Sequence, residues 1–502
     1  MSLALGALAG LLAGCGSRSG LYFFPEDAAP HEDAAPDAEP FDAAPPPPDC
    51  KRDADCDDLL YCNGPETCVD TRCAAGVSPC PAGDPCTMGA CDEPTDGCSL
   101  VPLDADLDGH QPLACAGDDC DDSNAAVYEN ALEVCDYLDN DCHGEVDEGF
   151  AYVGLGSDLN LSVGFENAQT PTLRYDGADF DAAFDTWPSG ISEVHYVAVA
   201  ADGASASAPA IRADSPVLSS SPALEWTGSE YGMFFHYHPE TEDRGAIGFR
   251  RLDADGDPLA DVLILTNADP DKDHPAAAWS GARYGVAHWA FPPDGDHFPI
   301  YFMGVSGAGA VEVEGWELSR GHALPFVPSV AWTGASFAAS FVEDGALVVA
   351  MVDADAESVI RRTTVSSDGG QASVVWNGSE LGVAYGETDG TGPLHFEWLD
   401  GDGDIVSGAR IEGTESATGV DLLWSGGVWA VTYQEEGADR GHFLVRIAED
   451  IAWTSSPGLV SDDYAWDGPA TSVTTAPRGY GVAYREGSGG LGTVRFRLAG
   501  CP

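Results

Sequence analysis

The densest chemistry in this sequence is a run of carboxylates between residues 99 and 150. The stretch DYLDNDCHGEVDE, at 136–148, contains six acids and an asparagine, and DADLDGH, at 104–110, alternates three aspartates before a glycine. Carboxylate oxygens are the ligands that calcium prefers, and alternating aspartates followed by glycine can fold a chain around one ion. The run therefore predicts a binding site for a divalent cation.

Neither stretch is a complete calcium loop. An EF-hand loop needs glutamate at its twelfth position, but that position is Cys115 when counted from Asp104 and Phe150 when counted from Asp139. Each half-loop offers about three or four of the six to eight oxygens that calcium takes. We expect the two half-loops and GDDCDD, at 117–122, to complete one shared coordination shell, held by disulfides among Cys115, Cys120, Cys135 and Cys142. The predicted ligands are Asp104, Asp106, Asp108, Asp119, Asp121, Asp122, Asp139, Asp141, Asp147 and Glu148.

Part of this region resembles a known family. DCDD at 119–122, EVCD at 133–136, DNDC at 139–142 and VDE at 146–148 are similar to a metal-binding motif first named from a copper-binding surface protein of methane-oxidising bacteria. The likeness covers about 45 residues and departs from the motif at Tyr137, at Glu129-Asn130 and at His143. It implies metal binding without fixing the metal.

The donor types favour calcium over the softer metals. Cysteines joined in disulfides cannot ligate copper or zinc, and His143 has only His110 as a nearby imidazole. Zinc modules usually contain a CxxC pair, and none occurs in the chain. The remaining carboxylates suit calcium, and magnesium or manganese less well. We therefore expect a structural calcium ion with a Kd on the order of 10⁻⁴–10⁻³ M, with an acidic segment that holds no functional metal as the alternative.

The cysteines predict a disulfide framework. Fifteen are present, and an even fourteen remain if Cys15 carries a lipid. Nine lie within 50–98, so at least one bridge must leave that segment, and we expect Cys501 to be tied to the N-terminal modules. The segment 50–98 has almost no apolar core and resembles the Cys-rich repeats of surface lipoproteins from high-GC Gram-negative bacteria. The disulfide candidates are Cys50, Cys56, Cys62, Cys68, Cys73, Cys80, Cys86, Cys91, Cys98, Cys115, Cys120, Cys135, Cys142 and Cys501.

The N-terminus has the pattern of an export signal. Residues 1–15, MSLALGALAGLLAGC, form an apolar run too short to span a bilayer. The ending resembles a bacterial lipobox, which implies cleavage before Cys15 and acylation of its thiol, and Gly16 points to the outer membrane. No Lys or Arg precedes the run, as a precursor that begins upstream of Met1 would explain. Residues 16–49, rich in Pro, Ala and Asp, predict a disordered tether.

Residues 151–502 contain a repeat of about 50 residues, whose clearest form is Trp-x-Gly-x-x-aromatic-Gly-Val-Ala-aromatic. Copies begin at Tyr175, Trp226, Trp279, Trp332, Trp376, Trp424 and Thr475. Repeats of this length built only of short strands and turns indicate a β-propeller. The predicted fold is all-β: a seven-bladed propeller preceded by a disulfide-rich module at 50–98 and an acidic metal-binding module at 99–150.

Three features of the repeat could have either a structural or a ligand-binding role. The repeated Trp and Tyr are expected in the blade cores rather than in a ligand cage. LDADGD at 252–257 and LDGDGD at 399–404 are expected to be turns, with calcium binding as the alternative. Four histidines near two neighbouring repeats could form a site, although local roles are expected; they are His236, His238, His288 and His297.

Charge and motifs limit the function. The chain has 84 acidic and 21 basic residues, a net charge of −63, which argues against a nucleic-acid partner and against binding an anionic membrane through protein charge. No G-x-S-x-G, P-loop or H-E-x-x-H motif occurs. We expect a non-enzymatic surface lipoprotein whose propeller binds an extracellular protein or glycan. The alternatives are a propeller glycosidase or lyase, which a carboxylate pair of raised pKa at the propeller mouth would indicate, and a purely structural envelope protein.

Overall fold

The computed structural model describes most of the chain from Cys50 to Cys501. The described residues are 50–74, 76–80, 83–144, 146–148, 150–165, 167–187, 192–213, 218–238, 244–267, 270–292, 295, 297–321, 327–435, 441–448, 454–462, 471–476, 479–487 and 492–501. Cys15 and the tether at 16–49 lie outside them. Within this part of the chain there are three short 3-10 helices and no α-helix, and no helix is long and apolar enough to cross a membrane.

Contacts divide the chain into two compact units. One contains the described residues from Cys50 to Cys80 together with Gly89–Leu100, and the other contains Gly83–Met88 and the described residues from Val101 to Cys501. The acidic module and the repeat region therefore belong to the same unit.

The first unit is stabilised by disulfide bonds rather than by a hydrophobic core. It contains η1 (Asp53–Asp55), η2 (Glu93–Thr95) and the hairpin of β1 (Thr67–Val69) and β2 (Arg72–Ala74), while the hairpin of β3 (Thr87–Asp92) and β4 (Gly97–Pro102) has residues in both units. Its only buried hydrophobic residues, among those described, are Cys50 and Cys56. So small a module needs covalent links to fold, and it has four: Cys50–Cys68, Cys56–Cys73, Cys62–Cys91 and Cys80–Cys98.

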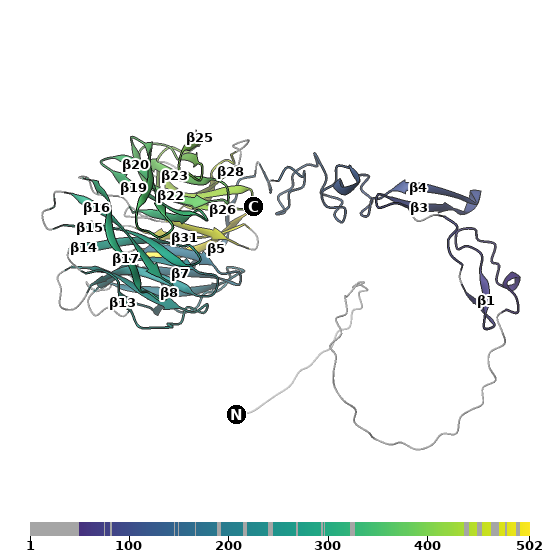
Figure 1. The fold of residues 1–502 in the computed structure, drawn as a ribbon, viewed down its shortest axis with the longest axis horizontal. Coiled ribbons are helices and arrows are strands. Elements are labelled where there is room, and N and C mark those ends of the chain that lie inside the picture. The colour runs from purple at the N-terminus through teal and green to yellow at the C-terminus, as the bar shows by residue number, and fades with distance from the viewer. Residues whose placement is uncertain are drawn as a thin grey trace, which may run out of the picture. The chain divides into compact units, whose positions relative to one another are not determined.

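The repeat region forms a seven-bladed β-propeller, as predicted. Each blade is a four-stranded antiparallel sheet, and the sheets are arranged around a common centre (Figure 1). Blade 1 contains β6 (Ala168–Tyr175), β7 (Asp179–Thr186), β8 (Glu193–Ala200) and β9 (Ala210–Ile211). Blade 2 contains β10 (Leu218–Trp226), β11 (Tyr231–His238), β12 (Ala246–Leu252) and β13 (Leu263–Ile264). Blade 3 contains β14 (Asp271–Trp279), β15 (Arg283–Phe291), β16 (Phe298–Ser306) and β17 (Val311–Gly321).

The remaining blades follow the same order. Blade 4 contains β18 (Ser329–Trp332), β19 (Ser336–Glu343), β20 (Ala346–Asp353) and β21 (Val359–Ser366). Blade 5 contains β22 (Gly369–Trp376), β23 (Leu381–Glu387), β24 (His395–Leu399) and β25 (Ile405–Arg410). Blade 6 contains β26 (Ala417–Ser425), β27 (Val428–Glu435), β28 (Gly441–Ala448) and β29 (Gly458–Ser461).

Blade 7 joins the two ends of the region and so closes the ring. Its strands β30 (Thr471–Thr475), β31 (Tyr480–Glu486) and β32 (Thr493–Gly500) come from the end of the chain. Its fourth strand, β5 (Val153–Asn160), comes from the start of the region and pairs with β32. The ring is thus closed by strand pairing within blade 7, while each blade keeps only short sheet edges.

The aromatic-Gly pair of the repeat packs one blade against the next. A Cβ on Gly285 of blade 3 would lie 2.6 Å from Phe337 of blade 4, and a Cβ on Gly382 of blade 5 would lie 2.7 Å from Trp429 of blade 6. The glycine therefore makes room for the ring that the following blade contributes. The same contact closes the propeller, because a Cβ on Gly481 of blade 7 would lie 2.6 Å from Phe180 of blade 1. The repeated aromatic residues are blade core, as predicted.

The Trp-x-Gly signature marks the turn between the first two strands of a blade. In blade 4, Gly334 has φ +87°, a conformation that other residues resist, and the Thr333 N–H donates to the Ser336 carbonyl at 2.9 Å. This turn reverses the chain so that Trp332 packs on Phe337, with ring centroids 4.7 Å apart.

Candidate metal centre

The first half-loop gathers its aspartates around one turn. Asp104, Asp106 and Asp108 each offer a carboxylate oxygen, and these oxygens lie within 4.8 Å of one another. Asp104 shapes the turn by accepting the N–H groups of Leu107 at 2.7 Å and of Gly109 at 3.1 Å. Gly109 has φ +98°, as the glycine of a sharp turn should. The sequence prediction for this turn therefore corresponds to a real convergence of carboxylates.

Asp119 adds a buried carboxylate to this group. Its backbone pairs with the segment after the half-loop, since the Asp119 N–H donates to the Gln111 carbonyl at 2.9 Å and the Leu113 N–H, at the start of η3 (Leu113–Cys115), donates to the Asp119 carbonyl at 2.7 Å. The Asp119 residue is 1% exposed. Removal from water, with repulsion from Asp106 and Asp108, raises the pKa of the Asp119 carboxyl.

Asp122 completes the group, because its carboxylate accepts the Ala105 N–H at 2.9 Å. Removal from water also raises the pKa of Asp106, with smaller contributions from repulsion by its acidic neighbours. We call this set the amino-terminal cluster; it consists of Asp104, Asp106, Asp108, Asp119 and Asp122.

A second cluster forms around the other half-loop. Glu133, Asp141 and Glu148 each offer a carboxylate oxygen within 4.8 Å of the others, and we call this set the motif cluster. Glu133 is held in place because its Oε1 accepts the N–H groups of Asn140 at 2.7 Å and of Asp141 at 3.0 Å. Removal from water and repulsion from Glu133 and Asp141 raise the pKa of Glu148 to about 8. Burial also raises the pKa of Glu133, so two of the three side chains lose acidity where the carboxylates converge.

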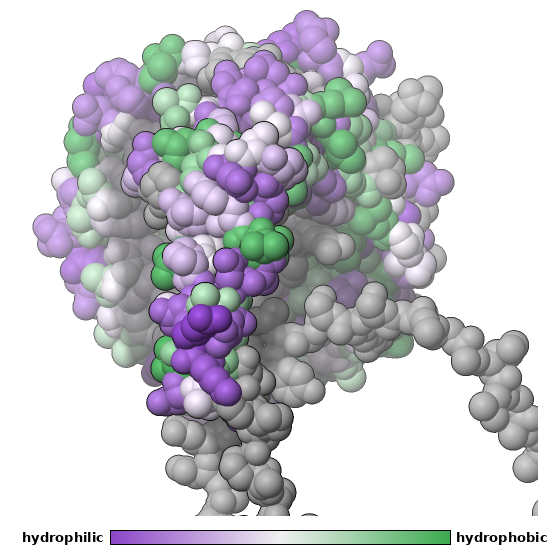
Figure 2. Space-filling model, turned by 90° about the vertical axis from the view of Figure 1, so that its right-hand side faces the viewer, coloured by the Kyte–Doolittle hydropathy of each residue, from purple (hydrophilic) through white to green (hydrophobic). Residues whose placement is uncertain are grey.

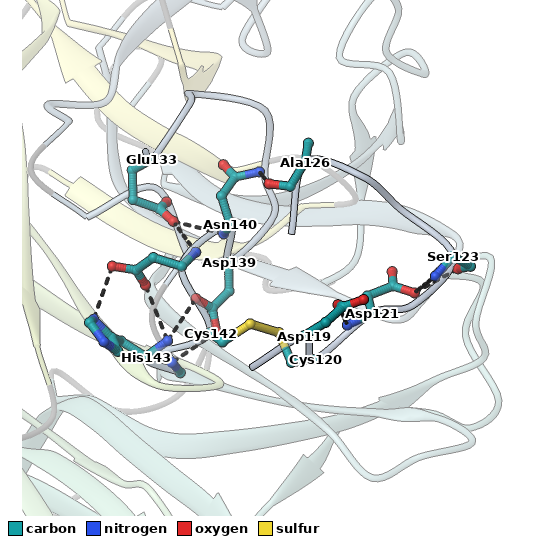
Figure 3. The surroundings of a disulfide bond; sticks show 12 residues. Asp119, Cys120, Asp121, Ser123, Ala126, Glu133, Asp139, Asn140, Cys142 and His143 are labelled. Atoms are coloured by element: carbon teal, nitrogen blue, oxygen red, sulfur yellow. Dashed lines mark hydrogen bonds and ion pairs between the residues drawn. A yellow bond between two sulfur atoms is a disulfide. The ribbon is translucent and has the colours of Figure 1, made fainter. Parts of the chain in front are cut away.

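Asp139 and His143 shape the loop that carries Asp141. The Asp139 carboxylate accepts the N–H groups of His143 at 3.2 Å and of Gly144 at 2.8 Å. The His143 ring is more than half exposed, and its Nδ1 lies 2.9 Å from Asp141 Oδ2. Figure 3 shows His143 beside the Asp139 loop, with Glu133 approaching Asn140 from the other side.

One disulfide joins the chain segments that carry the two clusters. Cys120 is bonded to Cys142, so the chain that carries Asp119 is joined to the loop that carries Asp139 and Asp141 (Figure 3). The converging carboxylate oxygens form two groups, one around each half-loop, where the sequence predicted one shared coordination shell. The half-loops recruit different partners: Asp119 and Asp122 for the first, and Glu133 and Glu148 for the second.

Three other details differ from the sequence predictions. Cys115 and Cys135 bond to Cys86 and Cys501 rather than within the acidic module. Asp121 is exposed and bonds the Ser123 hydroxyl at 2.6 Å, away from both clusters. The set of ligands predicted from the sequence does not include Glu133, because this residue lies outside both half-loops. The stretch EVCD that contains it was nevertheless part of the motif. The disulfide framework itself is confirmed, and Cys501 is tied to the N-terminal side as expected.

Asp147 joins the acidic module to the propeller instead of joining a cluster. It is fully buried, and its Oδ1 accepts the N–H groups of Asp136 at 2.8 Å and of Tyr137 at 3.0 Å, while the Tyr152 hydroxyl donates to Oδ2. Its backbone carbonyl accepts from the Arg446 guanidinium of β28 at 2.8 Å. Both oxygens of the Asp147 carboxylate therefore already accept hydrogen bonds from the protein.

Five carboxylate oxygens of the two clusters are buried and accept no hydrogen bond from the described residues. They are Asp106 Oδ2, Asp108 Oδ2, Asp119 Oδ2, Glu133 Oε2 and Glu148 Oε2. A buried carboxylate oxygen without a donor is costly unless it is protonated or binds a cation. The donor set contains only oxygen, because every cysteine nearby is in a disulfide. The geometry fits a hard divalent cation in either cluster.

The propeller offers weaker candidates. The turns at Asp253–Asp257 and Asp400–Asp404 are closed by their own backbone, since Asp257 N donates to Asp253 Oδ1 and Asp404 N to Asp400 Oδ1, each at 2.8 Å. An arginine of the preceding blade contacts each turn, with Arg212 Nη2 2.9 Å from Asp257 in the first and Arg361 bonded to Asp404 in the second. These turns have the structural role that the sequence favoured.

The histidines do not gather into a metal group among the described residues. His236 Nδ1 lies 3.2 Å from the Ser220 hydroxyl, and the fully buried His288 has its pKa lowered to about 4 by burial. His238 lies at the end of β11, and His297 lies just before β16.

A cavity of about 180 Å³ lies at the centre of the propeller, lined by the first strand of every blade. Two carboxylates line it, and both hold strands together. Glu225 lies 3.3 Å from Arg174 and accepts the Trp279 N–H at 3.3 Å, while Asp421 accepts the Ser373 hydroxyl and the Val473 N–H, each at 3.0 Å. Burial raises the pKa of Glu225, and the Arg174 charge opposes the shift. On the face seen in Figure 2, hydrophobic residues form small separate groups, with no broad apolar patch among the coloured atoms.

One comparison with known proteins agrees with the acidic part of this picture. Residues 119–148 match the family model Cu-binding_MopE, described as "Putative metal-binding motif". The chain thus contains a metal-binding motif, and the match includes the whole motif cluster. No curated protein is a significant match for the chain.

Among solved structures, the chain is similar to propeller proteins. A mutant sialidase of Trypanosoma rangeli that displays trans-sialidase activity is 14% identical, with a TM-score of 0.39 over 59% of this chain and 56% of that chain. The WD40 domain of Toxoplasma gondii coronin is 12% identical, with a TM-score of 0.41 over 70% of this chain and 89% of that one. The chain spans little more than half the length of the sialidase. None of these likenesses bears on activity, ligand or partner.

Proposed function

We propose that this protein is a lipid-anchored protein of the bacterial cell surface, in which a calcium-binding module supports a propeller that recognises an extracellular protein or glycan. Metal binding, display and recognition are three separable claims, and each has its own support and its own test.

The motif cluster carries the claim of cation binding. Glu133, Asp141 and Glu148 bring oxygens within 4.8 Å of one another, and two of these side chains keep an oxygen that accepts no hydrogen bond from the described residues. A cation would relieve the repulsion between the three carboxylates. Calcium suits this set best, because copper prefers nitrogen or sulfur and the one nearby imidazole, His143, is exposed and bound to Asp141.

The propeller supports recognition rather than catalysis. Both carboxylates that line the central cavity already bond to neighbouring strands, which favours a structural role for each of them. The enzyme alternative, a glycosidase or lyase, is separated from recognition by incubation with candidate polysaccharides. Binding without release of reducing ends supports recognition, and turnover contradicts it.

The surface location rests on the lipobox resemblance at Cys15 and on the disulfides. Disulfides persist in oxidising compartments outside the cytosol. Replacing Cys15 with Ala should move the full-length protein from the membrane fraction to the soluble fraction. Unchanged membrane partition of C15A would rule out the lipid anchor.

The cation claim is tested by isothermal titration of the full-length chain with Ca²⁺, with Cu²⁺ and Mg²⁺ as separate arms, at about 0.15 M salt to screen surface charge. Glu133→Gln with Glu148→Gln keeps the shapes of the side chains and removes two charges, and should abolish binding at the motif cluster. Asp121→Asn, in an exposed residue outside both clusters, is the control and should bind like the natural protein. Tighter binding of Cu²⁺ than of Ca²⁺, or equal binding by the glutamine variant, would contradict the proposal.

A further inference from the structure

The amino-terminal cluster repeats one arrangement at three aspartates. Asp106 Oδ1 accepts the Asp108 N–H at 3.3 Å, Asp108 Oδ1 accepts the His110 N–H at 2.7 Å, and Asp119 Oδ1 accepts the Asp121 N–H at 2.8 Å. In each residue the other oxygen, Oδ2, is buried and accepts no hydrogen bond from the described residues. One oxygen thus fixes each side chain, and the second is left for another partner.

Asp119 shows that this is more than a group of surface acids. The residue is 1% exposed, so its Oδ2 cannot be satisfied by bulk water. A buried carboxylate oxygen that accepts no hydrogen bond is costly unless it is protonated or binds a cation. The covalent and backbone links around Asp119 keep it in place despite this cost.

The acidic module supplies no cationic side chain to neutralise the cluster. No Lys or Arg occurs between residues 101 and 150. Its two histidines are His110 and His143, and the Nδ1 of His110 lies 3.0 Å from Asp118, outside the cluster. Arg446, from the propeller, contacts the backbone carbonyls of Val146 and Asp147. Besides protonation, a bound cation is the way to balance the charge of these carboxylates.

We propose that Asp104, Asp106, Asp108 and Asp119 hold a second Ca²⁺ ion, independent of the ion at the motif cluster. The inference rests on the proposed cation binding by the acidic module, but it concerns a separate set of ligands. Three of the four lie outside the matched stretch 119–148. The oxygen-only donors and the Asp-x-Asp-x-Asp-Gly spacing favour calcium, whose larger, flexible shell suits a turn better than the octahedron that magnesium requires.

The two sites share no ligand, although they share a disulfide. Asp119 precedes Cys120, and Asp141 precedes Cys142, so the Cys120–Cys142 bond fixes the distance between the sites without joining their coordination shells. Two ions should therefore bind with separate affinities, and removing one site should leave the other occupied.

The test counts Ca²⁺ ions on the full-length chain by equilibrium dialysis with metal analysis at about 0.15 M salt. The natural protein should bind two ions in the millimolar range or below. Asp106→Asn with Asp108→Asn should bind one, Glu133→Gln with Glu148→Gln should bind one, and the four changes together should bind none. Asp121→Asn should keep two, and an unchanged propeller unfolding transition in each variant excludes a general folding defect.

The outcomes separate the two claims. If the asparagine variant keeps two ions, or if the natural protein binds one ion that the asparagine variant also retains, the second site is wrong. If the natural protein binds a single ion and each of the two variants loses it, the half-loops share a single shell and the inference is overturned. If the natural protein binds a single ion that the asparagine variant loses and the glutamine variant keeps, the amino-terminal site stands and the proposed motif site falls.

Discussion

Cys135 of the acidic module is bonded to Cys501, which directly follows the last strand of the propeller, across 366 residues of sequence. The Cys501 N–H also donates to the Tyr137 hydroxyl at 3.2 Å. Because β32 pairs with β5 in the blade that closes the ring, this bond ties the acidic module to the closure of the propeller. The module is therefore part of the propeller's structure.

Replacing Cys135 and Cys501 with Ser should lower the free energy of unfolding of the propeller by about 2–5 kcal/mol, because the bond constrains a very long loop of the unfolded chain. Urea unfolding of the full-length protein measures this change. The Cys120→Ser with Cys142→Ser variant is the control. It should weaken cation binding while leaving the main propeller transition near its natural midpoint, and a similar loss in both variants would argue against a specific role at the closure.

Arg446 makes the same connection without a covalent bond. The residue is 1% exposed, its guanidinium donates to the Asp147 carbonyl, and its Cζ lies 4.3 Å from the centroid of the Tyr152 ring. Arg446→Lys should lower the free energy of unfolding by about 1–3 kcal/mol. A lysine cannot donate to the carbonyls of both Val146 and Asp147 and also stack on the Tyr152 ring. Arg283→Lys, at a partly exposed ion pair with Glu312, should change the free energy of unfolding by about 1 kcal/mol or less. Chemical denaturation of both variants compares the two values.

Much of the fold could be predicted from the sequence because the repeat encodes contacts between neighbours. In several blades the glycine of the repeat lies against an aromatic ring of the following blade. The contact of Gly481 with Phe180 is of this kind and closes the ring. The arrangement of the acidic module was harder to predict, because residues distant in sequence are brought together there by the path of the chain. Glu133 reaches Asp141 only through the turn around Asn140, whose carbonyl accepts the Tyr128 N–H at 2.9 Å. No local spacing predicts that path, so counting along each half-loop suggested one shared site where the structure has two clusters.

The glycine of the repeat can be tested at the closing contact. A Cβ at residue 481 would lie 2.6 Å from Phe180, so Gly481→Ala should destabilise the propeller by about 1–3 kcal/mol through overpacking. Phe180→Leu should relieve part of this loss, and a double-mutant cycle measures the coupling between the two positions. Additive effects of the two substitutions would show that the contact does not carry the energy of closure.

Gly334 provides the matched comparison, because a Cβ at this position would have no heavy atom within 4 Å, while its φ is +87°. Gly334→Ala should cost about 1 kcal/mol through backbone strain alone. Gly334→Asn should cost less, since asparagine tolerates the left-handed conformation better than alanine. Thermal unfolding of Gly334→Ala and Gly481→Ala distinguishes backbone strain from overpacking. Only the destabilisation caused by Gly481→Ala should change when Phe180→Leu is added in the neighbouring blade.

Acid should weaken the propeller through its buried histidines. His442 of β28 is fully buried, and its Nε2 lies 3.0 Å from the Arg485 carbonyl of the next blade, so the neutral ring donates this hydrogen bond. Burial lowers the pKa of His442 to about 4, and the hydrogen bond opposes the shift. His195 and His288 are also fully buried, and burial lowers the pKa of each to about 4.

The unfolded chain binds protons at these histidines near pH 6.5, whereas the native protein binds them only near pH 4. Between these values the unfolded state holds more protons, so the stability present above pH 6.5 is lost as the pH falls towards 4. His442→Gln keeps a donor for the Arg485 carbonyl and should remove up to about 3 kcal/mol of this dependence. Unfolding free energies of the natural protein and of this variant at pH 7.5, 5.5 and 4.5 provide the measurement, and an equal dependence in both would exclude His442 as an acid-sensitive point of the propeller.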